Sequence, residues 1–291
     1  MAQSIRSRFS ETGPLPAWPT GAAQSGYVIF TPGRAGSTLL GDALARTGVC
    51  GAPHEFFNPG AAAHFDPNSQ ATSFGDYLQI IIRDWSRAGR FGFKIDWFRL
   101  NDVCELIDFE QAFPPSHFQY IYLTRRDVVA QAYSMAHAIK SGVWHRSADE
   151  EDVSVADSRV NGVDLWKHIG LVFEAESKFE AFFAANNISP LRIDYGVICV
   201  NLQDAAAVVM NHVGCSPTEI VQGLAHIKRG GYNPLDYDVA RASLIIQFKI
   251  AYRGLLEELA TQRGKIGVED VGAFLRENLP GHKRSDRASG Q

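Results

Sequence analysis

Two glycines and a basic residue lie in the segment TPGRAGSTLL, between an apolar run and an amphipathic one. Gly33 and Gly36 let the backbone turn tightly, so that its N–H groups can approach an anion. Ser37 and Thr38 stand where a helix would begin, and they can cap that helix or bond phosphate oxygens. Arg34 adds a full positive charge to the turn. The segment is typical of a phosphate-binding loop, although an ordinary strand-to-helix turn with a serine cap has the same pattern.

The segment differs from the loop of nucleotide hydrolases. That loop reads G-x-x-x-x-G-K-[ST]; its lysine reaches the terminal phosphates and its Ser/Thr holds magnesium. Here Gly36 is followed directly by Ser37, and the later apolar run YIYL leads into TRRD. Arginines therefore stand where a magnesium-holding acid would be expected. This disfavours a protein that handles a magnesium nucleotide, and we expect no metal at the site.

A second basic element lies in LTRRDVVAQAYSMAHAIKSGVWH. Arg125 and Arg126 follow an apolar run, and Ser134 stands eight residues after Arg126, about two turns into a predicted helix. The arginine fork suits a dianionic phosphate, and a serine hydroxyl can join it. Pairing of Arg126 with Asp127 or another surface acid is the alternative. Two anion-binding elements at neighbouring strand ends would suit a ligand with phosphates at two separate positions.

Together these motifs resemble those of sulfotransferases. PGRAGST is similar to their 5′-phosphosulfate loop, with Arg34 where many members have lysine, and RRDVVAQAYS is similar to their 3′-phosphate element. The stretch 34–57, with FGFKIDW (91–97) and SGVWH (141–145), resembles more specifically the bacterial trehalose sulfotransferase branch. The spacing agrees over residues 27–145, about half of the chain, and the similarity is too weak to align beyond about residue 160.

The resemblance implies transfer of a sulfuryl group from 3′-phosphoadenosine 5′-phosphosulfate (PAPS) to a hydroxyl of a carbohydrate-type acceptor, such as trehalose, another glycan or a glycolipid. It implies that Arg126 and Ser134 hold the 3′-phosphate and that the loop holds the 5′-phosphosulfate. The loop residues concerned are Arg34, Ala35, Gly36, Ser37, Thr38 and Leu39. Gly33 and Ala35 replace polar residues that are frequent in that loop, so fewer side-chain contacts are expected there. A homodimer is also implied.

Sulfuryl transfer needs a base for the acceptor hydroxyl and a positive charge near the bridging oxygen that leaves. Glu55, in GAPHEFF, matches the position of the base proposed in the trehalose branch; a loop acid or an ion-pair partner of Arg34 is the alternative. Phe56 and Phe57 flank it and indicate apolar surroundings. Lys94 lies within an apolar strand, and we interpret it, together with Arg34, as a cation near the transferred group. Snorkelling at the strand end is the alternative for Lys94.

Three further residues are candidates for contact with the acceptor, besides Glu55. His54 is adjacent to Glu55 and is an alternative base, since histidine is the commonest one. Trp144 and His145 could face a sugar or the adenine of the donor.

The elements that must position these residues follow from the hydrophobic pattern. Short apolar runs separated by amphipathic stretches predict a central, mostly parallel sheet flanked by helices on both faces, a three-layer α/β fold of the P-loop-like kind. The predicted strands span 27–31, 90–95, 118–124 and 190–195. The predicted helices span 37–47, 73–88, 126–141, 162–186, 200–213 and 237–262.

No internal repeat or long linker divides the chain, so we predict a single domain over residues 26–279. Residues 1–25 and 280–291 are polar and contain Gly, Pro and Ser, and we expect mobile tails there. The acidic stretch 147–158 is typical of a solvated loop, and a flap over a site is the alternative.

The composition narrows the class of protein. A chain of 291 residues with 45% hydrophobic residues can bury a large core. A net charge of −4 argues against a general nucleic-acid binder, whose footprint is basic. The N-terminus lacks the apolar run of a signal peptide, and no stretch approaches the roughly 20 apolar residues of a membrane span. The four cysteines have no metal-ligand spacing, and we expect a reduced cytoplasmic protein that acts on a small molecule.

Two other classes of function remain open. A nucleotide-binding module without turnover would keep both loops as a sensor, and the presence of Glu55 and Lys94 argues against it. A metal-independent small-molecule kinase is opposed by the missing Gly-Lys and by the second basic element. The identity of the acceptor follows from the resemblance alone, which is weak support for a substrate.

Overall fold

The computed structural model describes residues 4–9, 11–66, 70–144, 160–227 and 239–263. The chain divides into two compact units. The first comprises residues 1–126 and 183–234, and the second comprises residues 127–182 and 235–291. The single domain over 26–279 stays a prediction, and the stretches 147–158 and 280–291 lie outside the described residues.

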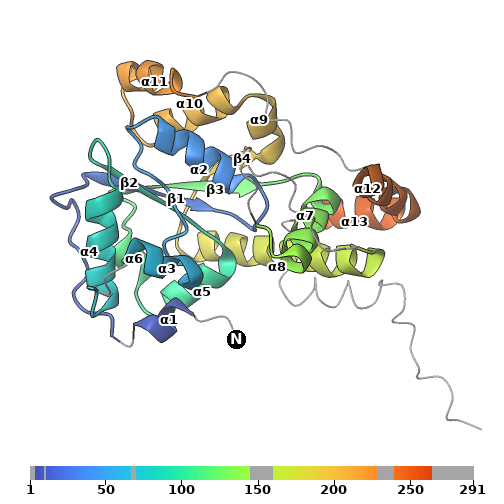
Figure 1. Ribbon diagram of the computed structural model, residues 1–291, viewed down its shortest axis with the longest axis horizontal. Helices are drawn as coiled ribbons and strands as arrows, with labels where there is room; N and C mark the ends of the chain where they lie inside the picture. The colour runs from blue at the N-terminus through green and yellow to red at the C-terminus, as the bar shows by residue number, and fades with distance from the viewer. Residues whose placement is uncertain (1–3, 10, 67–69, 145–159, 228–238, 264–291) are drawn as a thin grey trace, which may run out of the picture. The chain divides into compact units, whose positions relative to one another are not determined.

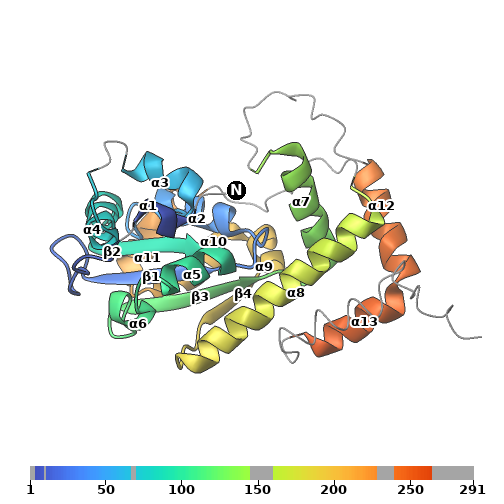
Figure 2. The ribbon, with the colours of Figure 1, turned by 90° about the horizontal axis from the view of Figure 1, so that it is seen from below.

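A four-stranded parallel sheet forms the centre of the first unit, with its strands side by side in the order β2-β1-β3-β4 (Figures 1 and 2). The strands are β1 (Ser25–Phe30), β2 (Arg90–Ile95), β3 (Phe118–Thr124) and β4 (Leu191–Asp194). The prediction of a parallel sheet is confirmed, with strand ends within two residues of those expected. Because all four strands are parallel, their carboxyl ends meet at one edge. Open α/β sheets bind their ligands at that edge, where the strand order reverses beside β1.

One face of the sheet is covered by a layer of four helices (Figure 1). They are α2 (Ser37–Arg46), α9 (Tyr195–Val200), α10 (Leu202–His212) and α11 (Pro217–Leu224). Alternate strand residues point to this face, so that Tyr27 and Ile29 of β1 pack with Leu40 and Leu44 of α2. Val209 of α10 joins the same buried cluster.

The other face of the sheet is packed by aromatic rings and by a second set of helices. These helices are α3 (Pro59–Phe65), α4 (Phe74–Trp85), α5 (Trp97–Cys104) and α6 (Phe109–Ala112). Phe93 of β2 contacts Phe57 and Phe113, and Phe30 of β1 contacts Phe109, with ring centroids 4.8–6.1 Å apart. The two helical layers and the sheet make the three-layer, P-loop-like α/β fold that the hydrophobic pattern predicts.

Part of the N-terminal segment packs onto this unit, which differs from the expectation of a polar tail. Helix α1 (Ile5–Arg8) buries Ile5, and Phe9 lies against the rings of Phe74 and Tyr77. The Trp18 indole donates a hydrogen bond to the Ala112 carbonyl at 2.8 Å. A few apolar residues in a polar segment are enough to hold it, because the aromatic face of the unit offers them a partner.

The described part of the second unit is helical. It contains α7 (Val128–Ser141), most of α8 (Gly162–Ala185), α12 (Val239–Ala251) and α13 (Arg253–Gln262). The prediction of one helix over 237–262 is wrong, because the helix is interrupted at Tyr252. The φ of −118° and ψ of 25° at Tyr252 leave the helical range, and its ring packs against Trp166 and Phe248.

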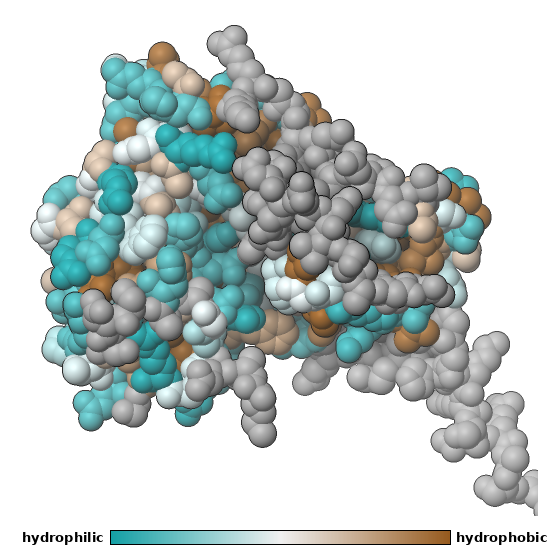
Figure 3. Space-filling model, viewed as in Figure 1, coloured by the Kyte–Doolittle hydropathy of each residue, from teal (hydrophilic) through white to brown (hydrophobic). Residues whose placement is uncertain are grey.

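None of the described helices is long and apolar enough to cross a bilayer. The part of the first unit that faces the viewer in Figure 3 is mostly hydrophilic, with hydrophobic side chains in scattered positions. Scattered apolar exposure of this kind is normal for a folded domain.

Candidate functional site

The turn between β1 and α2 has a left-handed backbone at three positions. The φ angles of Gly33, Arg34 and Gly36 are 86°, 55° and 85°. The glycines adopt such angles without strain, whereas Arg34 does so at a cost of about 1 kcal/mol or more. A strained residue within a tight glycine turn at the carboxyl edge of the sheet marks this loop as a candidate site.

Helix α2 begins directly after the turn and has no side-chain cap. Its N-cap is Gly36, where no side-chain hydrogen bond is made, so neither Ser37 nor Thr38 takes the capping role that the sequence allowed. Ser37 is buried and Thr38 is half-buried. Since no side chain at the N-cap accepts from the first-turn N–H groups, these donors can serve an anion, which the helix dipole also attracts.

Arg125 and Tyr195, which follow the ends of β3 and β4, contact the loop. The Arg125 guanidinium donates to the carbonyl of Arg34 at 3.3 Å and lies over the Tyr195 ring, 4.4 Å from its centroid. A Cβ on Gly36 would lie 2.7 Å from the same tyrosine ring. The glycine is therefore required by close approach as well as by its φ angle. The pattern of the sequence did not identify Tyr195, which follows the last strand directly.

Lys94 is the residue of β2 that contacts both the loop and Glu55. It pairs in register with Ile29 and shares its face of the sheet, so its side chain points toward α2. The Lys94 ammonium donates to the Thr38 hydroxyl at 2.9 Å and lies 3.6 Å from a carboxylate oxygen of Glu55. Only 6% of the residue is exposed. Burial lowers the pKa of Lys94, and the nearby carboxylates of Glu55 and Asp42 oppose that shift.

Glu55 lies in the turn that follows the isolated bridge between His54 and Phe93. Its side chain is 37% exposed, and its carboxylate also accepts from the Asn58 amide at 3.4 Å. The apolar surroundings expected from Phe56 and Phe57 are not what the structure has. Both rings are buried in the aromatic core, and the Glu55 carboxylate instead lies next to the Lys94 ammonium and the Asn58 amide.

His54 lies beside Glu55 and is held by its backbone and its ring. The carbonyl accepts from the Lys94 N–H at 3.0 Å, and the ring packs edge-on against Phe56 and Trp85. Burial and the positive charge of Lys94 lower its pKa. A neutral imidazole near Glu55 is the result at neutral pH.

Two acids near Lys94 or Glu55 escaped the sequence analysis. Asp96 directly follows β2 and caps α5, accepting from the Arg99 N–H at 3.1 Å; burial and the charge of Glu55 raise its pKa. Asp42 is exposed on α2, one turn after Thr38, and its charge acts on both Lys94 and His54. The motif FGFKIDW contains Asp96 and could have identified it. No motif in the sequence around Asp42 indicates a role for that residue.

Arg126 lies between β3 and α7, and it contacts Asp194 at the end of β4. The Asp194 carboxylate accepts from the Arg126 backbone N–H at 2.9 Å and lies 3.9 Å from its guanidinium. The Arg126 side chain is 90% exposed, so it can reach a ligand. Asp127, the alternative partner, instead caps α7 and pairs with Lys249 at 2.7 Å.

The remaining predicted residues are Ser134, Trp144 and His145. Ser134 is half-buried on α7 and Trp144 is 48% exposed beyond its end, and both belong to the second unit. A shared ligand for Arg126 and Ser134 therefore stays a prediction, as does the contact of Trp144 with a substrate. His145 lies outside the described residues.

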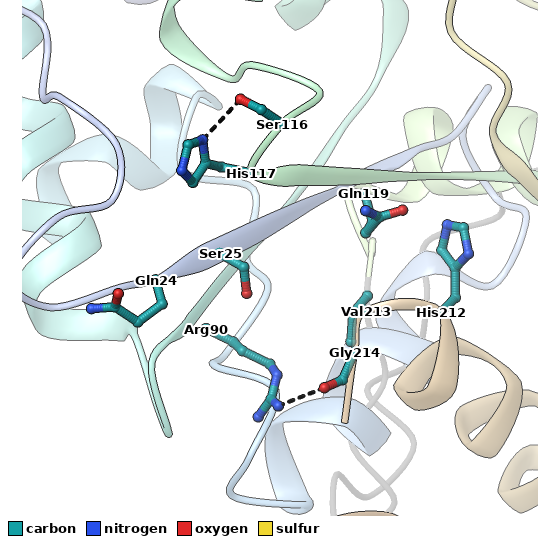
Figure 4. Close-up of a pocket in the computed structure, with 9 residues that line it drawn as sticks. All are labelled: Gln24, Ser25, Arg90, Ser116, His117, Gln119, His212, Val213 and Gly214. Carbon is teal, nitrogen blue, oxygen red and sulfur yellow. Dashed lines mark hydrogen bonds between the residues drawn. The ribbon is translucent and has the colours of Figure 1, made fainter. Parts of the chain in front are cut away.

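A cavity of about 260 Å³ lies at the opposite edge of the sheet (Figure 4). Its lining includes Ser25, Arg90 and His117, which stand at or next to the amino ends of β1, β2 and β3. The phosphate-type loop is at the carboxyl ends of the same strands, so this cavity is separate from the candidate site.

The parallel sheet with helices on both faces and a glycine loop after β1 defines a P-loop-like α/β protein. The chain belongs to the Stf0 sulphotransferase family, whose sequence model matches residues 26–232. The resemblance to sulfotransferases of the trehalose branch is thereby confirmed.

Two characterised relatives are trehalose 2-sulfotransferases. The chain is 25% identical to that of Mycolicibacterium smegmatis over 234 residues, which cover 66% of this chain and 85% of the relative. It is also 25% identical to that of Mycobacterium tuberculosis over 232 residues, with the same shares of the two chains.

Solved structures with a similar fold are also sulfotransferases. Mouse sulfotransferase SULT7A1 complexed with PAP has a TM-score of 0.48 and 13% identity, with 95% of this chain and 93% of that one covered. The sulfotransferase domain of the Synechococcus PCC 7002 olefin synthase has a TM-score of 0.45 and 12% identity, with coverage of 85% and 98%. At these TM-scores neither likeness bears on the place of any residue.

Proposed function

We propose that this member of the sulfotransferase family transfers a sulfuryl group from PAPS to a hydroxyl of a sugar-type acceptor. The observation that carries the proposal is the position of Lys94, whose ammonium is 2.9 Å from the Thr38 hydroxyl and 3.6 Å from the Glu55 carboxylate. One buried cation thus joins the phosphate-type loop to the candidate base.

The reaction assigns a role to each of these groups. Glu55 takes the proton of the acceptor hydroxyl as its oxygen attacks sulfur. The bond between sulfur and the bridging oxygen breaks, and the electron pair leaves with 3′-phosphoadenosine 5′-phosphate (PAP). Lys94 and Arg34 stabilise the negative charge that develops on that oxygen, an effect that is strong where water is excluded.

The donor also explains the second basic element. PAPS carries phosphate at its 3′ position as well as at the 5′ end, and the exposed Arg126 side chain at the carboxyl end of β3 offers a charge for it. Ser134 would supply a hydroxyl to the same phosphate. The trehalose 2-sulfotransferase relatives support a sugar, and trehalose is the first acceptor to test. A homodimer in the cytoplasm stays a prediction.

A transfer assay tests this proposal. The full chain is incubated with PAPS and a panel of sugars headed by trehalose, and mass spectrometry detects the sulfated product. We expect product with at least one sugar, and its loss in Lys94→Met. Binding of PAP without transfer to any sugar, glycolipid or small alcohol would favour a nucleotide-binding module. Phosphate transfer from ATP would favour a kinase.

Calorimetry with PAP and AMP tests the donor contacts. A charge-assisted contact is worth about 1.5–3 kcal/mol, or about ten- to a hundredfold in affinity. We expect PAP to bind more tightly than AMP by that factor, and Arg126→Ala to shrink the preference. Arg34→Ala is the matched control, since it should weaken both nucleotides alike. Equal affinities in the unmodified protein would contradict the assignment of Arg126.

A further inference from the structure

Two cysteines that are far apart in the sequence meet in the first unit. Cys50 follows α2 and Cys215 follows α10, 165 residues later, and their sulfur atoms are 3.7 Å apart. Cys50 is fully buried and Cys215 is 6% exposed. The sequence showed four scattered cysteines, and only the packing of α10 beside α2 brings these two together. Cys104 is exposed and Cys199 is half-buried.

Arg90 holds both cysteine segments in place. Its guanidinium donates to the Val49 carbonyl at 3.3 Å and to the Gly214 carbonyl at 2.9 Å, the residues that directly precede the two cysteines. Glu219 fixes the guanidinium from the other side with two hydrogen bonds of 2.7 and 3.2 Å. The same fork therefore sets the spacing of the two sulfurs.

The charges around the pair favour one thiolate. The hydrogen bond between the two sulfurs, together with Arg90, lowers the pKa of Cys215, against its partial burial and the charge of Glu219. Burial and the same bond raise the pKa of Cys50, while Thr47 and Arg90 act in the opposite direction. Tyr27 donates to the Cys50 carbonyl at 2.9 Å and stays protonated, since burial raises its pKa. A lowered pKa makes Cys215 the nucleophile of the pair.

A cavity lies beside the segment that carries this nucleophile. The cavity in Figure 4 is lined by Arg90, Val213 and Gly214, and Gly214 directly precedes Cys215, which is 6% exposed. Its volume of about 260 Å³ is far larger than a peroxide molecule needs.

We propose that Cys50 and Cys215 form an intramolecular disulfide when the protein meets a peroxide. The Cys215 thiolate attacks one peroxide oxygen, which gives a sulfenic acid and releases hydroxide. The Cys50 thiol then attacks the Cys215 sulfur, the S–S bond forms, and water leaves. Two thiols are oxidised and one peroxide is reduced to two waters. The sulfurs must close from 3.7 Å to about 2.05 Å.

The disulfide would join the end of α2 to the end of α10. Because it would close a loop of well over a hundred residues, it constrains the unfolded chain strongly. We expect the melting temperature to rise by several degrees on oxidation and to return on reduction. This inference does not depend on the acceptor or the donor of the proposed reaction.

Mass spectrometry of the full chain tests the proposal. The protein is treated with hydrogen peroxide, remaining thiols are alkylated, and the digest is searched for linked peptides. We expect a linked Cys50–Cys215 peptide, a loss of about 2 Da, two hydrogen atoms, in the intact mass, and the reversible rise in melting temperature. The double variant Cys104→Ser with Cys199→Ser should behave in the same way, which excludes a bond through either of those thiols.

Three outcomes would overturn the proposal. Cys50 and Cys215 could both stay open to alkylation after unfolding while Cys104 is oxidised. Cys215 could gain oxygen without any link to Cys50. The linked peptides could join other pairs of cysteines. As a second measurement, Arg90→Lys keeps the charge but loses the fork, and we expect it to slow the formation of the linked peptide about tenfold. An unchanged rate in a folded Arg90→Lys protein would contradict the role given to Arg90.

Discussion

At the scale of the residue, the groups around Glu55 support its candidate role as a general base. Its carboxylate lies 3.6 Å from an ammonium group that is almost entirely withdrawn from water. The ion pair and the hydrogen bond from the Asn58 amide orient the carboxylate, and orientation is what a general base requires.

Glu55→Gln should lower turnover by about 10²–10⁴, the usual cost of losing a general base. The affinity for PAP should stay nearly constant, because the role proposed for Glu55 concerns the acceptor and not the donor. Steady-state kinetics and calorimetry measure the two quantities. Asp42→Asn is the matched control, since it removes the same charge from the surroundings of Lys94 and should change turnover little. Near-full turnover of the glutamine variant would make Glu55 structural and His54 the next candidate.

His54 should make the stability of the protein depend on pH. Burial and Lys94 hold its pKa below the ordinary value of 6.5 in the folded state. As the pH falls below that value, the unfolded chain binds a proton at this histidine that the folded chain does not. The free energy of unfolding is therefore unaffected by His54 above about pH 6.5 and decreases below it. Calorimetric melting between about pH 7.5 and 5 should show a steeper decline for the natural protein than for His54→Gln. Parallel curves would mean that the folded-state pKa of His54 is not depressed.

At the scale of the element, the turn before α2 is shaped by what lies beneath it. Arg125 and Tyr195 come from the ends of β3 and β4, and they support the backbone at Arg34 and Gly36. The carboxyl ends of three strands thus contribute to a loop that appears local in the sequence.

Gly36→Ala should therefore impair the site more than a glycine change elsewhere. An alanine at φ of 85° costs about 1–2 kcal/mol, and its Cβ would also lie 2.7 Å from the Tyr195 ring. Gly48→Ala is the matched control, because Gly48 has a φ of 70° and nothing within 4 Å of an added Cβ. We expect both variants to melt earlier and only Gly36→Ala to lose PAP affinity in calorimetry. Equal losses of affinity, or none in either variant, would show that Tyr195 does not hold the loop.

At the scale of the whole molecule, the charge of the site comes from protein cations. Arg34, Lys94 and Arg126 lie at the carboxyl edge of the sheet, and the described part of the chain contains no group of three or more His, Cys, Asp or Glu residues arranged to hold a metal ion. Sulfuryl transfer also moves less charge than phosphoryl transfer.

Activity should survive a chelator, because arginine and lysine side chains are available to supply the positive charge that a metal would otherwise provide. In the transfer assay, product formation with excess EDTA should equal that without it, and added Mg²⁺ should not raise it. A buffer matched for ionic strength is the control, since added salt screens the basic site by itself. A strict requirement for Mg²⁺ would favour the kinase alternative.

The sequence by itself determined the strands, most of the long helices and the loop. These features are written in contiguous residues: an apolar period marks a strand, and glycines with a following Ser-Thr mark a turn into a helix. For the same reason FGFKIDW and GAPHEFF could be singled out one at a time. The helix break at Tyr252 was missed because it depends on packing against Trp166, a residue far away in the chain.

The tertiary structure alone decided which of these pieces meet. The strand order β2-β1-β3-β4 puts Lys94 next to the face of β1 that carries α2, and so within 2.9 Å of Thr38. The packing of α10 beside α2 joins Cys50 to Cys215 across 165 residues. Rings of α4 hold Phe9, and the Phe118 ring and the Ala112 carbonyl hold Trp18, although their segment is polar overall. Each of these contacts depends on how elements cross in space, and local periodicity carries no information on that.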